Sequence, residues 1–375
     1  MSKLKIGVFG CGRGRMMVEI MSQHPDAELV AICDKWEQGL KECEEIAQKF
    51  GVKLTTYTDF DKFLEHGLDA VVLANYATEH APYAIRCLNG GIHVVSEVLA
   101  VNTLDEAYDL VKAVRNSKAI YSYAENYCYF KSVREMRKLY KKGDIGEYLH
   151  GEGEYIHYEN PISHGKLTNN EDPSHWRNNM HSTFYCTHAT GPIMYITGMR
   201  PLCVSAMDSI EPERFKGWSN KASAGAIMTV KMENGGTAKF MPCCAFPRRP
   251  EAIWYAVYGT KGMMESDRWG STVNRIHVYR EPEPDKEKTI PFEDRHFYYE
   301  PDFNDCDLVR RTGHAGSDFF TMDVFLDAIL GRKGTEDMID VYEALDMTLI
   351  GTLAQESIKQ QGKYIEIPDF RKIKL

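Results

Sequence analysis

The sequence predicts an α/β protein of two domains: a doubly wound parallel sheet, then an α+β domain with an open, mostly antiparallel sheet. Three observations lead to this fold class. Up to about residue 124, short apolar runs alternate with helical patterns, as in parallel α/β sheets. Beyond that point glycine-rich turns join the apolar runs, which is typical of hairpins. With 375 residues, the chain is long enough for domains at 1–124 and 125–375.

In the first domain, β-branched apolar runs predict strands and the amphipathic stretches between them predict helices. The first two helical patterns end at helix breakers, Pro25 and Gly51. Strands connected through helices pair in parallel with right-handed crossovers. The predicted strands are 4–10, 27–34, 70–75, 93–97 and 119–125, and the predicted helices are 15–25, 37–51, 81–91 and 103–117.

The second domain begins with a helical pattern, 132–143, that ends at Gly143. Strand candidates follow, and the Asn234-Gly235-Gly236 turn predicts a hairpin within 225–243. Hairpin connections imply antiparallel or mixed pairing. The remaining predicted elements are strands in 148–158 and 252–266 and helices near 316–331 and 338–360.

Composition narrows the function classes. The net charge of −9 argues against a nucleic-acid surface, which needs a basic face. No apolar run approaches the ~18 residues of a membrane span, and the N-terminus enters a strand without a secretion signal. The ten cysteines show no zinc spacing, so reduced thiols in a cytoplasmic protein are expected, without a metal site. The 21 tyrosines and five tryptophans fit a carbohydrate or aromatic ligand, or core and interface positions.

The stretch GVFGCGRGRMM, residues 7–17, carries a dinucleotide-binding pattern between the first strand and the first helix. Gly10 and Gly12 permit a tight turn and let a pyrophosphate approach the backbone at a helix N-terminus. Arg15 occupies the third glycine place, with Gly14 one step early. Asp34 ends the second predicted strand, where an acid accepts hydrogen bonds from ribose hydroxyls and repels a 2′-phosphate. The pattern predicts NAD as the cofactor.

Beyond this turn, the chain resembles the Gfo/Idh/MocA oxidoreductase family over essentially its whole length. GCGRGR, AICD, NYATEH, GIHVVSEVL, AENYCY and TGHAGSDFF carry the resemblance. Where the family shows Glu-Lys-Pro, this chain keeps Glu97 but has Val98 and Leu99, so it lacks the lysine that handles the hydroxyl proton. The resemblance and the turn together imply these cofactor-binding residues: Gly10, Cys11, Gly12, Arg13, Gly14, Arg15, Asp34, Asn75, His80, Glu97 and Asn126.

A second stretch, HWRNNMHSTFYCTHATGP at 175–192, is similar to the branch that includes glycoside hydrolase family 109. Members of that family use bound NAD to oxidise a sugar hydroxyl transiently, and the leaving group departs by elimination. By this resemblance His188 is the hydroxyl base, and Tyr155 is the base for the α-proton once its pKa is lowered. Tyr185 and His157 are expected as catalytic partners, and the expected substrate contacts are Trp176, Arg177, His314 and Asp318.

These residues predict an NAD-dependent enzyme that oxidises a ring hydroxyl, such as C3, of a sugar or glycoside. The oxidation is either net or transient, and transient oxidation cleaves the glycosidic bond while NAD is recycled. Two alternatives stay open at this stage: a simple sugar or inositol dehydrogenase that releases NADH, and a non-catalytic NAD-binding regulator. The expected partners are a small carbohydrate or glycoside and further copies of the chain, with no nucleic acid or membrane.

Overall fold

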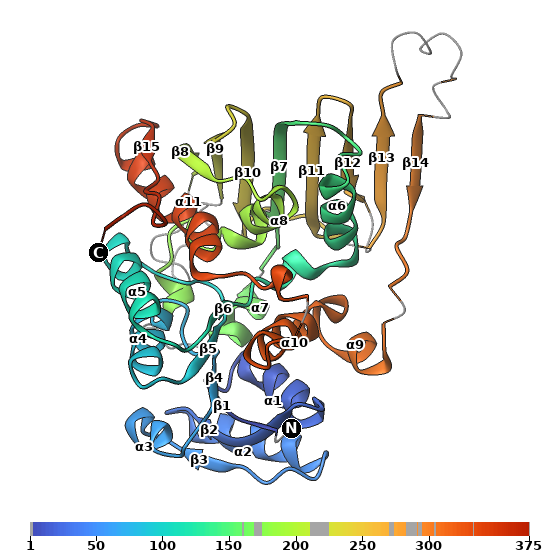
Figure 1. Ribbon diagram of the computed structural model, residues 1–375. Coiled ribbons are helices and arrows are strands. Elements are labelled where there is room, and N and C mark those ends of the chain that lie inside the picture. Colours follow the sequence, from blue (N-terminus) through green and yellow to red (C-terminus); the bar gives the residue numbers. More distant parts are fainter. Residues whose placement is uncertain are drawn as a thin grey trace. The chain divides into compact units, whose positions relative to one another are not determined.

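The computed structural model describes residues 3–159, 161–168, 175–210, 225–269, 274–282, 291, 295–303, 305–332 and 334–374. The chain forms two compact units, each with its own sheet (Figure 1). Unit 1 comprises residues 1–126, 305–345 and 369–375, and unit 2 comprises residues 127–304 and 346–368. The predicted boundary at 124/125 is close to the first crossing between the units. The predicted domain 125–375 is not one unit, however, because two of its segments return to unit 1.

Unit 1 is built on a six-stranded sheet in the order β3-β2-β1-β4-β5-β6. Every pairing in this sheet is parallel, so the predicted doubly wound α/β sheet is confirmed. One edge strand, β3, was not predicted, because its three residues are polar and largely exposed. The strands are β1 (Leu4–Phe9), β2 (Ala27–Cys33), β3 (Thr55–Tyr57), β4 (Ala70–Leu73), β5 (His93–Ser96) and β6 (Tyr121–Tyr123). The helices between them are α1 (Gly14–Gln23), α2 (Glu37–Gln48), α3 (Phe60–Leu64), α4 (His80–Asn89) and α5 (Leu104–Asn116).

The C-terminal part of the chain completes the core of unit 1. Helix α9 (Asp307–Arg311) leads through a short turn, η5 (His314–Gly316), into α10 (Ser317–Ile329). Met322 and Phe325 of α10 are fully buried in the same cluster as Met17 and Met21 of α1. Because α10 packs in the core of unit 1, the prediction that residues 125–375 form one domain is wrong for this C-terminal segment. After η6 (Thr335–Asp337), helix α11 (Val341–Lys359) begins in unit 1 and continues in unit 2.

Unit 2 is built on a nine-stranded sheet in the order β14-β13-β12-β11-β7-β10-β9-β8-β15 (Figure 1). Only the β7–β10 pairing is parallel among the described pairs, so the predicted open, mostly antiparallel sheet is confirmed. The strands are β7 (Tyr148–Ile156), β8 (Pro201–Asp208), β9 (Ala226–Met232), β10 (Thr237–Cys243), β11 (Ala252–Gly259), β12 (Gly262–Ser266), β13 (Ile276–Arg280), β14 (His296–Tyr299) and β15 (Ile365–Glu366). The helical elements are η1 (Asn126–Tyr129), α6 (Lys131–Lys141), α7 (Pro161–Leu167), η2 (Trp176–Asn178) and α8 (Thr187–Thr197).

Helix α8 packs closely on the centre of this sheet. A Cβ added to Gly153 of β7 would lie 2.0 Å from the carbonyl oxygen of Ala189, so only glycine allows this approach. All residues of α8 from Thr187 to Ile196 are buried. The close packing fixes the N-terminal turn of α8, which carries His188, against the end of β7, which carries Tyr155.

Candidate active site: a dinucleotide turn and an aromatic cluster

The phosphate turn in unit 1 joins β1 to α1. Gly10 has a φ of +102°, and a Cβ there would lie 2.4 Å from the carbonyl oxygen of Ala74, so glycine is required. A Cβ on Gly14, the first residue of α1, would lie 3.0 Å from Val8 Cγ1. Gly14 therefore allows the close helix–strand contact that the third glycine of the fingerprint provides, although it stands one position early.

Gly12 differs from the other two glycines of the turn, Gly10 and Gly14. It is exposed, its φ is not positive, and an added Cβ would meet no atom within 4 Å. Nothing in the described fold therefore requires glycine at this position. The open space beside its backbone fits the approach of a pyrophosphate, which a side chain would obstruct.

Asp34 lies beside the turn at the end of β2. Its carboxylate accepts hydrogen bonds from the backbone amide of Cys11 at 2.5 Å and from that of Trp36 at 2.9 Å. These bonds fix the carboxylate against the turn, at the carboxyl end of the parallel strands. An acid in this position suits the ribose hydroxyls of NAD and disfavours a 2′-phosphate.

Asn75 and His80 follow β4 at the same edge of the sheet. Both polar atoms of the Asn75 side chain are buried, and no described residue hydrogen-bonds to either. Such orphaned groups are costly unless a ligand or water satisfies them, so Asn75 fits a cofactor contact. His80 lies between the carbonyl oxygens of Leu99 (2.8 Å) and Asn75 (3.3 Å), and burial lowers its pKa to about 4. His80 is therefore a neutral clamp that positions these two segments.

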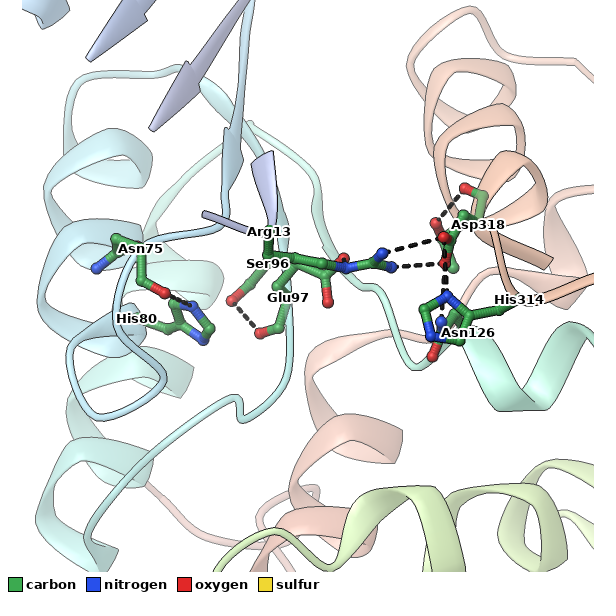
Figure 2. A network of polar contacts seen from close by, with 9 residues as sticks. Arg13, Asn75, His80, Ser96, Glu97, Asn126, His314 and Asp318 are labelled. Atoms are coloured by element: carbon green, nitrogen blue, oxygen red, sulfur yellow. Dashed lines mark hydrogen bonds and ion pairs between the residues drawn. The ribbon is translucent and has the colours of Figure 1, made fainter. Parts of the chain in front are cut away.

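Arg13 is the centre of a polar network at the turn. Its Nε donates to Glu97 at 2.9 Å, and its two terminal nitrogens donate to the two oxygens of Asp318 at 3.0 and 2.5 Å. Figure 2 shows Arg13 pointing from the turn to Asp318, whose carboxylate also meets Asn126 at 2.8 Å and His314 at 2.9 Å. Burial opposes the charge on Asp318, but His314 and Arg13 outweigh it and hold the pKa of this carboxyl well below its usual range.

Two further residues near the turn, Arg15 and Val98, do not present a charge to the cofactor. Arg15 pairs with Glu42 of α2 at 2.5 Å and lies over the ring of Trp36, so its charge is engaged on the helix side. Val98 is 5% exposed and follows Glu97 directly, which leaves no ionisable group at the place of the family's lysine. Burial raises the pKa of Glu97, while Arg13 lowers it.

The four residues that the sequence predicts as catalytic come together in unit 2. His188 lies 4.9 Å from Tyr155 and 5.0 Å from Tyr185, measured between ring centroids. Tyr155 stacks on His157 at 5.4 Å. Tyr127 was not predicted from the sequence as a site residue. Its ring stacks on His188 at 4.0 Å between centroids, with the ring planes 16° apart. Its only signal was its place in AENYCY, directly after Asn126.

One expectation for this aromatic cluster (Tyr127, Tyr155, His157, Tyr185 and His188) needs correction. Tyr155 was expected to be a base with a lowered pKa, but burial, Tyr127 and Cys244 raise its pKa well above 10. Its phenol therefore keeps the proton at neutral pH and suits a proton donor. Burial also lowers the pKa of His157, against the opposing effect of Glu251, whose carboxylate lies 3.6 Å from His157 Nε2.

Arg177 takes part in a buried ion-pair network beside the cluster. Its guanidinium meets Glu159 at 3.2 Å, and the other Glu159 oxygen meets His164 at 3.1 Å. It also lies over the rings of Trp176 (4.5 Å) and Tyr185 (5.0 Å). Burial disfavours the Glu159 carboxylate, but Arg177 and the His164 hydrogen bond lower its pKa overall. The charge of Arg177 is thus matched within the protein, while Trp176 remains half-buried beside Tyr185 at 5.6 Å.

Comparisons with known proteins bear on both halves of the chain. Residues 4–125 match the Gfo/Idh/MocA family model, described as an oxidoreductase family with an NAD-binding Rossmann fold. Residues 204–375 match the C-terminal domain of glycosyl hydrolase 109. The N-terminal part of the chain is thus similar to the Gfo/Idh/MocA oxidoreductases, and its C-terminal part is similar to glycosyl hydrolase 109 proteins. The resemblance drawn from the sequence is therefore confirmed, and the cofactor is NAD.

Individual relatives align along most of the chain. A glycosyl hydrolase family 109 protein of Stenotrophomonas maltophilia is 26% identical over 98% of this chain and 89% of its own length. An alpha-N-acetylgalactosaminidase of Tannerella forsythia is 28% identical over 92% of this chain and 81% of its own. The solved myo-inositol 2-dehydrogenase of Lactobacillus plantarum shares the fold, with a TM-score of 0.72 and 19% identity over 98% of this chain and 100% of that one.

The described residues fit NAD on three observations. Gly12 leaves open space beside the turn, the Asn75 amide is buried without a partner, and Asp34 is fixed for the ribose hydroxyls. No group of metal-ligating side chains occurs among the described residues, and none of the described helices has the length and hydropathy of a membrane span.

Proposed function

We propose that this protein cleaves glycosides by transient oxidation of a ring hydroxyl, with NAD retained and recycled. The observation that carries the proposal is His188 enclosed by Tyr127, Tyr155 and Tyr185, in a chain with Val98 where the Gfo/Idh/MocA oxidoreductases that it resembles carry a lysine. The match of its C-terminal half to glycosyl hydrolase 109 supports glycoside cleavage over simple dehydrogenation. When bound, NAD supplies the hydride acceptor that turns the ring hydroxyl into a ketone. The ketone makes the C–H bond on the neighbouring carbon acidic.

His188 is the base for the hydroxyl proton in this proposal. Its ring is held flat against Tyr127, and its backbone carbonyl accepts a 2.6 Å hydrogen bond from the Tyr255 hydroxyl. The ring contact holds the imidazole, and the hydrogen bond holds the backbone that carries it. A fixed imidazole accepts a proton efficiently because its geometry is already that of the reacting complex.

Tyr155 is the proton donor to the departing oxygen, and His157, whose pKa is lowered by burial so that its imidazole is neutral, accepts the α-proton. Its raised pKa keeps the phenol protonated at neutral pH, and the ring is held among Tyr127, His157 and Tyr185. Trp176 and Tyr185 supply the aromatic surface on which a sugar ring packs. Arg177 and Glu159 position that surface rather than bind the sugar, since their charges are matched to each other.

The experiment that tests the proposal is incubation of the purified protein with a panel of aryl glycosides, without added NAD, in deuterated water. We expect aglycone release over many turnovers, no accumulation of NADH absorbance, and deuterium at the sugar carbon next to the oxidised one. NADH formed in step with a keto-sugar would instead assign the protein as a sugar or inositol dehydrogenase. No turnover of any glycoside or polyol would favour an NAD-binding regulator.

We also propose that the protein acts inside the cell, on small glycosides, as a homo-oligomer. The supporting observation is a set of exposed apolar side chains on the sheet of unit 2: Leu149, Leu202, Met207 and Ile227. The large aromatic side chains of β10 and β11, Phe240, Trp254 and Tyr255, are buried within the unit and do not belong to this exposed set. Light scattering of the purified protein tests the assembly, and a monomer at micromolar concentration would contradict it.

A further inference from the structure

The segment Gly313–Asp318 enters unit 1 beside the phosphate turn, and the cofactor pattern of the sequence does not account for it. Asp318 is fully buried, and its two oxygens meet Arg13, Asn126 and His314. A Cβ on Gly313 would lie 2.5 Å from the Asp318 carboxylate and 3.1 Å from the terminal carbon of Met16. The segment therefore contacts both the arginine of the turn and the first part of α1.

The backbone of this segment is held in an unfavourable conformation. His314 and Ala315 have φ values of +53° and +57°, in the left-handed region that side chains with a Cβ rarely adopt. The Ser317 hydroxyl donates a hydrogen bond to the His314 carbonyl, and the His314 Nδ1–H donates one to the Asp318 carboxylate. Backbone strain of this kind persists where surrounding contacts over-determine it, and it is concentrated at ligand clamps and active sites.

Arg13 connects the segment to the cofactor turn itself. It stands between Gly12, whose open backbone suits the pyrophosphate, and Gly14, the first residue of α1. All three of its side-chain nitrogens are engaged by Glu97 and Asp318. A dinucleotide at this turn is thus bordered by an arginine that is anchored to two distant parts of the chain.

We infer that the Arg13–Asp318 ion pair, with His314, is a latch that keeps NAD bound between turnovers. Asp318 and His314 thereby belong to the cofactor site, not to the substrate site where the sequence placed them. This inference rests on NAD binding at the phosphate turn and is independent of the sugar chemistry. While the pair is closed, Arg13 is fixed beside the turn, so the state of the pair governs the rate of NAD release.

The test uses the full-length protein and measures bound NAD after gel filtration and its dissociation rate in the absence of sugar. Asp318→Asn and His314→Ala are each expected to release NAD at least about tenfold faster than the parent, the effect of losing about 1.4 kcal/mol of binding. Asp323→Asn is the matched control: it lies on the same helix, its carboxylate pairs with His24 at 3.1 Å, and its side chain is half-buried. We expect it to retain NAD like the parent.

A double variant separates the latch from folding. Arg13→Gln with Asp318→Asn removes the arginine and its bidentate carboxylate partner together, and the amide introduced at position 13 can still donate a hydrogen bond to Glu97. We expect this variant to melt near the parent temperature without NAD, yet to release NAD as fast as Asp318→Asn. Parent-like dissociation in the folded double variant and in His314→Ala would overturn the inference, whatever glycoside turnover shows.

Discussion

Val98 is apolar and buried at the position after Glu97, where the family that this chain resembles carries a lysine, so the hydroxyl proton needs another acceptor in this protein. The absence of the lysine is visible in the sequence itself. The sequence could also nominate His188, because the motif around it is local. It could not reveal that Tyr127 stacks on that imidazole, or that burial raises the pKa of Tyr155, because both depend on packing between distant segments.

At the residue scale, we expect His188→Ala to lower kcat/KM for glycosides by ~10²–10⁴, the usual contribution of a general base. The NAD content should stay at the parent level, because His188 belongs to unit 2 and the cofactor turn belongs to unit 1. His150→Ala is the control, since His150 is on β7 of the same unit but contacts Thr237 and not the aromatic cluster. Substantial activity in His188→Ala would remove His188 from the mechanism.

His80 leads to a pH-dependent stability difference. Its pKa falls from about 6.5 to about 4 in the folded protein, so the unfolded chain binds more protons between these values. The free energy of unfolding therefore decreases as the pH falls from 6.5 to 4, by about 3 kcal/mol from this residue. Denaturant unfolding across this range should show a smaller loss for His80→Gln than for the parent. Equal losses would contradict a buried, neutral His80; His181, whose pKa burial also lowers to about 4, contributes equally to both proteins.

At the element scale, the phosphate turn was predictable because its signals are consecutive in sequence: a strand, three glycines, a helix and an acid. The roles of the individual glycines were not. Gly14 performs the packing role expected one position later, and Gly10 is required by the close approach of Ala74. Only Gly12 is left without a structural reason.

Gly12→Ala should therefore separate folding from cofactor binding. We expect the melting temperature without NAD to stay within 1–2 °C of the parent, roughly the effect of a few tenths of a kcal/mol. The Kd for NAD, measured by calorimetry, should rise at least about tenfold. Gly10→Ala is the contrasting variant, because its Cβ meets backbone atoms and should lower stability directly. Unchanged NAD affinity in Gly12→Ala would place the pyrophosphate elsewhere.

At the scale of the whole molecule, the order of elements was predictable but the grouping of the C-terminal elements was not. Alternating strands and helices define a parallel sheet locally, whereas the return of 305–345 to unit 1 depends on apolar contacts across 300 residues of sequence. The same return brings Asp318 to Arg13, a contact between residues 305 positions apart that no local sequence pattern reveals.

A fragment of residues 1–126 should therefore not fold stably. It lacks the α10 side chains Phe319, Met322, Phe325 and Leu326, each worth roughly 2 kcal/mol when buried. We expect broad, non-cooperative thermal unfolding and no measurable NAD binding. The matched fragment, in which 305–345 is joined to 1–126 by a flexible linker, should recover a cooperative transition. Cooperative unfolding of 1–126 alone would show that α10 is not part of this core.

The central claim is that NAD is recycled within each turnover, and one measurement addresses it directly. The protein as purified is given an aryl glycoside without added NAD, and aglycone release and NADH absorbance are followed together. We expect many molecules of aglycone per protein with no net NADH. Aglycone or keto-sugar formed only with added NAD, and with one NADH per product, would contradict it.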